Sequence, residues 1–398
     1  MGGNFNGFHL HEPFKQRGIQ TSNAAFWNQT SKKDWSFNFS PGNLRRFQAE
    51  VVREIEIFSG FQSHFQWWSK DLLEHPNFIE SDVVHLQVIH DHVLRFETLK
   101  KIALAKPTVW TWHDLWPVTG HCIFPGKCAN WDGGCGNCPD LNLPLPVFRD
   151  RTKQEYKRKQ LILPQLDLDI HVTTQWMIEK TAPHVENLGL RIHRFPFGID
   201  LNTYAPKSGL SLRTKLGIPP NAIVIFARST DDERKGYLNL LKALDEISYH
   251  LEIHLVSVQQ QGLASIYTDN LSVTEFPWTN KPSDVSQLYS LADVFVMPST
   301  DESFGMMALE AMSCGRPVIT TSGSATAEIV KCPELEIDEN VSVESLRTVL
   351  ERSIRTNDLL PKLGIEARER AVTNFSLNSY LDNLVGLYSE TIERRRNA

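Results

Sequence analysis

The chain has 398 residues, of which 41% are hydrophobic and 22% are charged, and its formal net charge is −6. This length exceeds the size at which one hydrophobic core keeps growing, so we expect two α/β domains. The composition is that of an ordinary globular protein and argues against a fibrous or largely disordered chain. The negative net charge argues against a protein that coats nucleic acid, because phosphate binding needs a surplus of lysine and arginine.

Two kinds of targeting segment are missing from the sequence. No apolar run approaches the ~20 residues that a transmembrane helix needs. The first residues show no basic segment followed by an apolar stretch, which is the pattern of a signal peptide. We therefore expect the chain to be cytoplasmic.

Strand-length apolar runs alternate with helix-length amphipathic stretches, as in parallel sheets with helical crossovers. The expected strands are 83–87, 108–111, 170–173, 222–227, 251–257, 294–297 and 318–320. The expected helices are 43–58, 149–163, 237–247, 306–313 and 378–394. Proline and glycine lie close together within 195–200 and indicate a turn between the two alternating series. We expect domains at 1–196 and 197–376.

The N-terminus differs from the usual start of such a sheet. Gly2, Gly3 and Asn4 are similar to a glycine turn that leads into a helix at 10–17, yet no strand precedes them. Such turns normally follow a first strand. The chain is therefore expected to start late or to build its first sheet one strand short.

Two glutamates after the strand at 294–297 are separated by seven residues. Eight steps along a helix span about 12 Å, which is comparable to the reach from a sugar ring to the ribose of a sugar nucleotide. A carboxylate accepts hydrogen bonds from two hydroxyls, so Glu310 suits the ribose and Glu302, at the mouth of the helix, suits a transferred sugar. The alternative is an amphipathic helix with two solvated glutamates.

The start of this helix adds backbone donors. Free N–H groups of Phe304, Gly305 and Met306, next to Ser303, favour anions and sugar oxygens at a helix N-terminus. The run from 293 to 319 closely resembles the retaining glycosyltransferases of family four. That family has the GT-B fold, an α/β fold of two Rossmann-like domains facing a central cleft. The resemblance implies that the second domain holds a nucleotide diphosphate sugar and that the last helix, 377–398, crosses back onto the first domain.

The same family carries cations after the first strand of its donor domain. Here Arg228 follows the strand at 222–227, and Arg234 and Lys235 end the next turn. A departing nucleoside diphosphate gains negative charge, which fixed cations stabilise. The resemblance therefore implies catalytic roles for Arg228 and Lys235, which Arg234 can share. Ala227 stands where many relatives have glycine, and a solvated polar turn is the alternative.

A histidine and an aspartate follow the strand at 108–111. His113 and Asp114 resemble the family's His-Asp motif, in which the histidine faces the donor sugar. His113 can donate to a sugar hydroxyl or to developing charge, and Asp114 can fix its tautomer or orient the acceptor. An ordinary buried histidine is the alternative. The resemblance also places Gly3 on the acceptor side and Gly323, from a glycine-rich loop, near the donor.

The implied reaction keeps the anomeric configuration. No carboxylate can be named as a nucleophile, and the sequence has no Asp-x-Asp triplet of the kind that holds a nucleotide-bound cation. We expect catalysis that requires no metal or other cofactor, because arginine and lysine neutralise the diphosphate. UDP and GDP are the expected donor nucleotides.

Four of the six cysteines crowd into one segment, 119–140. A C-x5-C pair and a C-x2-C pair can supply four thiolates to a structural zinc ion: Cys122, Cys128, Cys135 and Cys138. Disulfides or free thiols are the alternative, and His113 or His121 can replace one ligand.

Residues 112–139 resemble a subgroup of family-four enzymes found in bacterial exopolysaccharide and colanic-acid-type gene sets. The resemblance implies a glycan acceptor carried on polyprenyl diphosphate, in exopolysaccharide, capsule or O-antigen synthesis. Basic residues gather just after this segment and, if helical, can lie against anionic lipid at the inner face of the plasma membrane, although a solvated helix face is the alternative: Arg149, Arg151, Lys153, Lys157, Arg158 and Lys159.

Three rival functions remain open at this stage. A GT-B epimerase needs acid and base groups around the sugar but no acceptor cleft. A phosphorylase is disfavoured because no motif for its lysine-bound cofactor is present. A catalytically inactive sugar-binding scaffold would bind the donor without turning it over.

Overall fold

The computed structural model describes residues 7–25, 34–39, 42–90, 93–279 and 281–397. Gly3 and the expected glycine turn around it lie outside these residues. The chain divides into two compact units. Unit 1 comprises residues 1–172, 177–195 and 381–398, and unit 2 comprises residues 173–176 and 196–380.

Unit 1 contains a four-stranded sheet in the order β3-β4-β5-β6, in which all neighbours are parallel. Its strands are β3 (Val84–Leu86), β4 (Thr108–Thr111), β5 (Asp169–Val172) and β6 (Arg191–Arg194). A separate parallel pair consists of β1 (Asn23–Ala25) and β2 (Ser36–Asn38). The two central strands, β4 and β5, are buried along their whole length and form the core of the unit.

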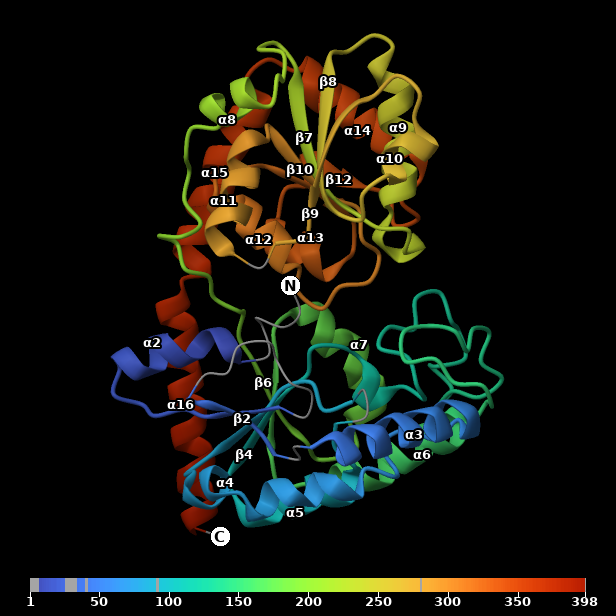
Figure 1. Ribbon diagram of the computed structural model, residues 1–398, viewed down its shortest axis with the longest axis vertical. Helices are drawn as coiled ribbons and strands as arrows, with labels where there is room; N and C mark the ends of the chain where they lie inside the picture. Colours follow the sequence, from blue (N-terminus) through green and yellow to red (C-terminus); the bar gives the residue numbers. More distant parts are fainter. Residues whose placement is uncertain (1–6, 26–33, 40–41, 91–92, 280, 398) are drawn as a thin grey trace. The chain divides into compact units, whose positions relative to one another are not determined.

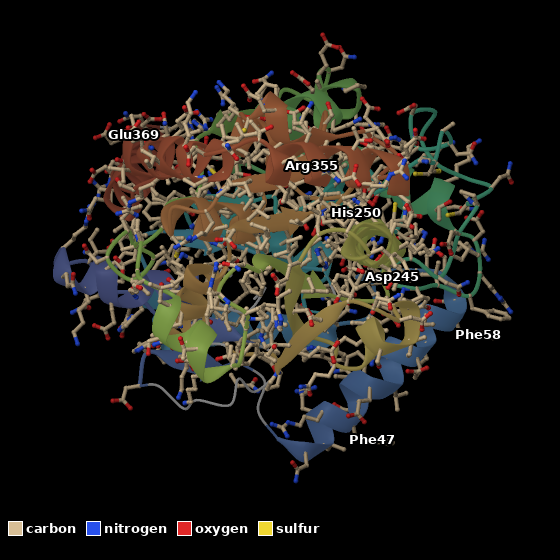
Figure 2. All side chains as sticks on the ribbon, turned by 90° about the horizontal axis from the view of Figure 1, so that it is seen from above. Phe47, Phe58, Asp245, His250, Arg355 and Glu369 are labelled. Carbon is tan, nitrogen blue, oxygen red and sulfur yellow. The ribbon has the colours of Figure 1, made fainter. Side chains whose placement is uncertain are left out.

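Helices surround the sheet of unit 1 (Figure 1). They are α2 (His11–Gln16), α3 (Asn43–Ser59), α4 (Pro76–Glu80), α5 (Phe96–Ala105), α6 (Thr152–Ile162), most of α7 (Gln175–Val185) and the C-terminal part of α16 (Leu377–Asn397). The long helix α3 carries Phe47 and Phe58, which Figure 2 labels along it.

The C-terminal helix is tied to the strands of unit 1. Tyr388 and His85 of β3 are hydrogen-bonded at 2.6 Å. The Thr391 hydroxyl donates to the buried carboxylate of Asp169 at 2.8 Å. Residues 381–397 therefore belong to the first unit although they follow the second along the chain.

Unit 2 is a six-stranded parallel sheet in the order β12-β11-β10-β7-β8-β9. Its strands are β7 (Ile223–Ser229), β8 (Ile253–Gln259), β9 (Ser272–Pro277), β10 (Val294–Met297), β11 (Val318–Thr321) and β12 (Glu336–Ile337). The chain builds the sheet outward from β7 to β9, then returns to the other side of β7 to build β10 to β12. The point where this order reverses lies between β7 and β10.

Helices cover both faces of this sheet (Figure 1). One face carries α9 (Tyr237–Ser248), α10 (Leu263–Tyr267) and α14 (Val343–Arg355). The other carries α8 (Leu210–Lys215), α11 (Pro282–Leu291), α12 (Met306–Ser313) and α15 (Leu359–Asn374), and α13 (Ala325–Val330) follows β11. A doubly wound unit of this kind is what the alternating sequence predicts.

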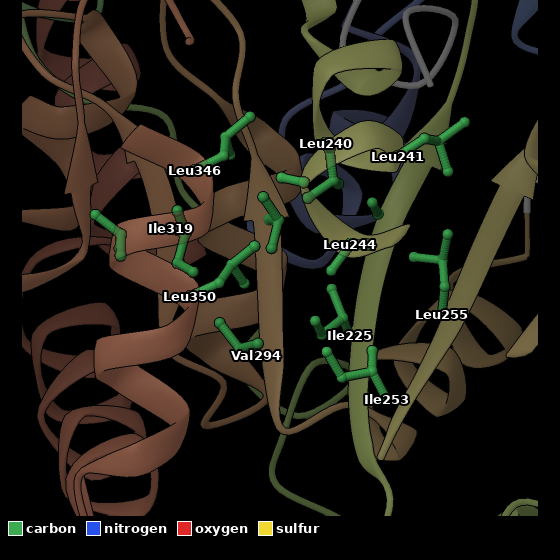
Figure 3. Packing of buried hydrophobic residues seen from close by; sticks show 14 of the residues in the cluster. Ile225, Leu240, Leu241, Leu244, Ile253, Leu255, Val294, Ile319, Leu346 and Leu350 are labelled. Carbon is green, nitrogen blue, oxygen red and sulfur yellow. The ribbon is translucent and has the colours of Figure 1, made fainter. Parts of the chain in front are cut away.

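The core under the first of these faces shows why the sequence folds this way. Leu240, Leu241 and Leu244 of α9 recur at helical spacing and are fully buried. They pack on Ile225 and Val294 of the two central strands (Figure 3). The apolar runs that predict the strands are therefore the runs that this helix covers.

Candidate functional site

The strand order of unit 2 fixes where a ligand can bind. In an open parallel sheet, ligands bind outside the carboxyl ends of the strands where the strand order reverses. Here β7 and β10 are adjacent, with Ala227 paired to Val296, so the loops that follow them leave from neighbouring points. The two segments singled out in the sequence, 228–236 and 298–306, are these two loops.

Lys235 and Glu302 meet at this point. The Lys235 ammonium donates to the Glu302 carboxylate at 2.7 Å and to the backbone oxygen of Asp301 at 3.1 Å. The loops are also joined by the Thr300 N–H, which donates to the Arg234 carbonyl at 2.9 Å. Both side chains of the ion pair keep about a fifth of their surface exposed, at 22% and 21%. The pair is therefore accessible to a charged ligand.

The other two expected cations point to different partners. The Arg234 guanidinium pairs with Asp232 of its own turn at 2.6 Å. Arg228 donates to the side-chain oxygen of Gln259, and its guanidinium lies 5.8 Å from the centre of the Trp278 ring. Arg228 thus lies at the end of β7, while Arg234 is held within its own turn.

The N-terminus of α12 follows Glu302 directly. Gly305 caps this helix with a φ of 96°, and a Cβ there would meet the Thr326 hydroxyl at 2.6 Å, so only glycine fits. Phe304 is buried and packs edge-on against Phe197, which leaves its backbone N–H as the group that can serve a ligand. With Met306 as the first helical residue, the first turn supplies N–H groups that have no partner within the helix.

Glu310 lies in a different environment from Glu302. It is buried, and its two carboxylate oxygens accept hydrogen bonds from Tyr204 at 3.2 Å and Tyr289 at 2.9 Å. Burial raises its pKa to about 7, against the opposing effect of these hydrogen bonds. A ribose hydroxyl would have to share this carboxylate with both tyrosines, and neither tyrosine contact is visible in the sequence.

Two further features belong to unit 2. Gly323 has a φ of 68°, and a Cβ there would lie 3.2 Å from the carboxylate of Glu339.

Residues 173–176 fall within the range expected for the first domain but are grouped with unit 2. The hydroxyls of Thr173 and Thr174 donate to the carbonyl of Ser303 at 3.2 and 3.0 Å, which explains this grouping.

The carboxyl edge of the unit 1 sheet carries His113. Its Nε2 is hydrogen-bonded to Gln87 Oε1 at 2.7 Å, which joins the segments that follow β4 and β3. Burial lowers the pKa of His113 to about 4, and the neighbouring Asp114 opposes this shift only in part. His113 is therefore neutral near pH 7.

Asp114 pairs with a histidine that the sequence analysis did not single out. Its carboxylate is 2.8 Å from His90 Nε2 and accepts the Trp116 N–H at 2.8 Å. Burial alone would raise the pKa of Asp114, but the charge and hydrogen bond of His90 hold it below its usual value. Asp114 therefore orients His90 rather than His113. No local spacing links His90 to Asp114, so only the folded sheet reveals the pair.

A cavity of about 140 Å³ lies beside this pair. Two hydrogen bonds join polar residues that line the cavity. Trp116 Nε1 donates to Gln62 Oε1 at 2.8 Å, and the Gln62 amide donates to the Leu145 carbonyl at 3.2 Å. Within the part of the chain that the structure describes, His90 Nδ1 is buried without a hydrogen-bond partner. The lining residues are Arg53, Glu56, Ile57, Gln62, Ser63, His90, Trp116, Leu145, Pro146 and Val147.

The cysteine segment is held by hydrogen bonds of the protein itself. All six cysteines are free thiols. Cys135 Sγ accepts the Gly120 N–H at 3.2 Å, and His121 Nε2 is 3.3 Å from Cys138 Sγ. Among the described residues, no three His, Cys, Asp or Glu side chains are arranged to hold a metal ion. The four cysteines do not form a zinc site among the described residues, so zinc stays a prediction.

The basic segment is only partly exposed to solvent: Lys153 and Lys157 are exposed on helix α6, and its contact with lipid stays a prediction. Helix α6 begins at Thr152, and Lys159 is completely buried. Its ammonium donates to the carbonyls of Trp116 and Thr119 at 2.7 and 3.1 Å. Arg158 donates to two backbone oxygens of the loop at 62–63. Both side chains support the loops around the cavity, because each donates to two backbone carbonyls of these loops.

Comparison with known proteins identifies the second unit. Residues 211–370 match the family model described as "Glycosyl transferases group 1". The chain contains a glycosyl transferases group 1 domain. This domain includes the Lys235–Glu302 pair and α12, so the family resemblance predicted from these segments is confirmed.

The chain is 29% identical over 259 residues to the Escherichia coli K12 protein named as a colanic acid biosynthesis glycosyl transferase, WcaC. That match covers 63% of this chain and 62% of the relative, which is less than two thirds of its length.

Two solved structures share the fold of this chain. Sucrose-phosphate synthase from Thermosynechococcus elongatus aligns with a TM-score of 0.65 at 17% identity, covering 97% of this chain and 92% of that one. HepE from Anabaena in complex with UDP and glucose aligns with a TM-score of 0.58 at 16% identity, covering 89% and 85%. The predicted α/β class with two parallel sheets of the GT-B type is confirmed.

Proposed function

We propose that this protein is a retaining glycosyltransferase that moves a sugar from a nucleoside diphosphate sugar to a hydroxyl of a glycan. The observation that carries the proposal is the Lys235–Glu302 pair, placed where the strand order of the group 1 domain reverses and beside the first turn of α12. Cation, carboxylate and free N–H groups converge there. A diphosphate and a sugar need these three kinds of partner.

Each donor-side group has a role in this proposal. Lys235 and Arg228 neutralise the diphosphate as it leaves, and the N–H groups of the first turn of α12 bind its oxygens. Glu302 accepts hydrogen bonds from hydroxyls of the transferred sugar. Glu310 binds the ribose if a ribose hydroxyl replaces one of the two tyrosine hydroxyls that donate to its carboxylate. UDP is the nucleotide we favour, since HepE, one of the structural neighbours, was solved with UDP and glucose.

The transfer itself needs no cofactor in this proposal. The acceptor hydroxyl attacks the anomeric carbon on the face from which the diphosphate departs, and the sugar–phosphate C–O bond breaks. A diphosphate oxygen takes the proton of the hydroxyl. In this proposal the single N–H of neutral His113, on Nε2, exchanges Gln87 Oε1 for a sugar oxygen and donates a hydrogen bond to it. An imidazole with a pKa of about 4 carries no charge to repel the anomeric centre.

The acceptor belongs to unit 1 in this proposal. Asp114, His90 and the cavity beside them form a hydrogen-bonding surface that suits a sugar unit. The similarity to WcaC favours a growing polysaccharide as acceptor, and a lipid-linked one would bring the enzyme to the cytoplasmic face of a membrane. Among the described residues, no helix is long and apolar enough to cross a bilayer.

The test is a product assay with purified full-length protein. Radiolabelled UDP and GDP sugars are incubated with lipid-linked oligosaccharide, and products are separated and examined by NMR. The proposal predicts a glycan product with the donor's anomeric configuration. Release of an isomeric sugar nucleotide would indicate an epimerase, and an inverted product would contradict the retaining mechanism.

A further inference from the structure

The cavity of about 140 Å³ in unit 1 is lined by side chains of two kinds. One kind is apolar: Ile57, Leu145, Pro146 and Val147. The other is polar: Arg53, Glu56, Gln62, Ser63 and His90. At about 30 Å³ per molecule the volume corresponds to about five waters, which is room for one sugar ring and not for two. A pyranose ring also combines apolar C–H faces with a rim of hydroxyls, so its surface matches this lining.

Two residues of the lining hold an unusual backbone conformation. Ser63 has a φ of 57° and Leu145 has a φ of 72°, in the left-handed region that residues other than glycine rarely adopt. Hydrogen bonds hold both in place. Arg158 donates to the carbonyls of Gln62 and Ser63 at 3.0 and 3.1 Å, and the Gln62 amide donates to the Leu145 carbonyl at 3.2 Å. Backbone strain that the surroundings maintain is typical of ligand sites.

Most polar groups of the lining are already bound by the protein. Glu56 Oε1 accepts the N–H groups of His64 and Phe65 at 2.8 and 3.2 Å. Glu56 Oε2 accepts from the Gln66 side chain at 2.7 Å. The Gln62 amide is bonded through both its oxygen and its nitrogen. These side chains fix the walls of the cavity and are not available to a ligand.

His90 offers an acceptor that the protein leaves unused. Its Nε2 lies 2.8 Å from a carboxylate oxygen of Asp114, so the single N–H of the neutral ring is on Nε2. Nδ1 is then an acceptor, and within the described residues it is buried without a hydrogen-bond partner. Buried polar atoms are normally paired. A ligand hydroxyl that donates to Nδ1 would supply the missing partner.

Arg53 offers a cation that a ligand can reach. Two other cations near the cavity are bound to the protein, because Lys159 and Arg158 each donate to two backbone carbonyls. Arg53 is exposed on α3 and also lines the cavity, which places it at the mouth. In the part of the chain that the structure describes, its guanidinium has neither an ion pair nor a hydrogen bond.

The acidic groups around the cavity limit the charge of the ligand. Glu56 lines it and Asp114 borders it, and donors of the protein already bind both carboxylates. Glu50 and Glu54 are exposed beside Arg53 on α3 and form no ion pair with it among the described residues. One negative charge at the mouth is matched by Arg53, whereas a phosphate monoester carries nearly two. A carboxylate also binds a guanidinium through two parallel N–H groups.

We propose that the cavity is a specificity subsite for a hexuronic acid unit of the acceptor glycan. The carboxylate of the uronic acid binds the Arg53 guanidinium at the mouth, and a ring hydroxyl donates to His90 Nδ1. The C–H surface of the ring packs on the apolar lining. A neutral hexose fits the same volume but leaves Arg53 without an anion, so it binds less tightly.

The role of this subsite rests on the proposed function, because an acceptor implies a transfer reaction. Binding of a monosaccharide is nevertheless measured without donor or transfer. Uronide binding in a protein that transfers no sugar would refute the transferase and leave the subsite standing. Sugar transfer by a protein that binds no uronide would refute the subsite and leave the transferase standing.

The probes are the methyl glycosides of glucuronic acid, galacturonic acid and glucose, with methyl glucoside 6-phosphate as a second anion. Their dissociation constants for the full-length protein are measured by NMR titration. The tighter of the two uronides is expected to bind about tenfold more tightly than the glucoside, because a hydrogen bond to a charged group is gained.

Arg53→Gln tests the assigned contact. It is expected to remove the advantage of the uronide, so that uronide and glucoside bind alike, while the affinity for the glucoside changes less than twofold. Arg46→Gln is the matched control, because Arg46 is also exposed on α3 but is not part of the cavity lining. The control is expected to keep the tenfold preference for the uronide.

Three results would overturn the subsite. One is a glucoside that binds as tightly as both uronides. Another is a preference for the uronide that survives Arg53→Gln or is lost equally in Arg46→Gln. The third is tighter binding of the glucoside 6-phosphate than of either uronide, which would make the recognised anion a phosphate. Thermal unfolding checks that both variants fold, as expected for exposed side chains.

Discussion

The carboxyl ends of the two sheets carry polar groups of opposite character. In unit 2 the ion pair of Lys235 and Glu302 is open to solvent and made of full charges. In unit 1 the corresponding edge is a nearly closed set of hydrogen bonds, with neutral His113 on Gln87 and His90 on Asp114. Under the proposed function, unit 2 binds the ligand whose charge changes and unit 1 orients the acceptor.

Removal of the Lys235 cation is expected to have the largest effect on the donor side. We expect Lys235→Ala to lower kcat/KM for transfer by roughly 10²–10³-fold, the size seen when one stabilising group is lost from a charged transition state. Lys362→Ala serves as control, because its side chain is 72% exposed and pairs with Glu366 at the surface. Steady-state kinetics in which both variants keep full activity would remove Lys235 from the mechanism.

On the unit 1 side, Asp114→Asn keeps the shape but removes the charge. We expect kcat to fall roughly 10- to 100-fold, since a hydrogen bond to a charged group contributes about 1.5–3 kcal/mol. Affinity for the nucleotide is expected to stay unchanged, because the donor is assigned to the other unit. Exposed Asp269→Asn is the control. A loss of nucleotide affinity equal to the loss of kcat would contradict the assignment of the donor to unit 2 alone.

Glu310 tests whether the donor site extends into the core of unit 2. If Glu310 binds the ribose, Glu310→Gln weakens UDP binding by about tenfold at about pH 8, where a carboxyl with a pKa of about 7 is mostly ionised and the variant loses a hydrogen bond to a charged group. Tyr289→Phe removes one of its internal partners and should lower stability by about 1 kcal/mol while UDP still binds. Calorimetric titration and urea unfolding distinguish the two roles. Loss of stability alone in both variants would make Glu310 a core residue.

The histidines of unit 1 predict a pH dependence of stability. Burial lowers the pKa of His113 to about 4 and that of His171 to about 3. The folded state therefore holds them neutral, whereas the unfolded chain takes up protons below about pH 6.5. Stability present above that pH is lost as the pH falls, by up to about 1.4 kcal/mol per pH unit for each histidine. Urea unfolding at pH 7.5 and 5.0 measures this slope, and His171→Asn should reduce it; an unchanged slope would contradict the assignment.

The sequence predicts the central elements of both sheets because their signals are local. The runs at 108–111 and 294–297 match β4 and β10, and the helix at 306–313 matches α12. These strands are buried along their whole length, so they read as continuous apolar runs. The strands β6, β9 and β12 were not predicted, because they lie at sheet edges and mix exposed polar residues with apolar ones.

The same contrast between local and long-range signals holds for the residues of the candidate site. The Lys235 and Glu302 segments are short, and each contains a motif of its own. The sequence alone therefore predicted that both belong to the donor site. The partners of Asp114 and Glu310 could not be found this way, since His90 lies 24 residues from Asp114 and Tyr204 lies 106 residues from Glu310. Such contacts are set by the packing of elements and leave no spacing in the sequence.

The most direct test of the account is thermal unfolding of the full-length protein with UDP, GDP and ADP, alongside Lys235→Ala. A nucleotide at a hundredfold excess over Kd stabilises the folded state by about 2.7 kcal/mol, which raises Tm by several degrees. We predict such a shift with UDP and its loss in Lys235→Ala. No shift with any of the three nucleotides, or an equal shift in the variant, would contradict a donor site at the junction of β7 and β10.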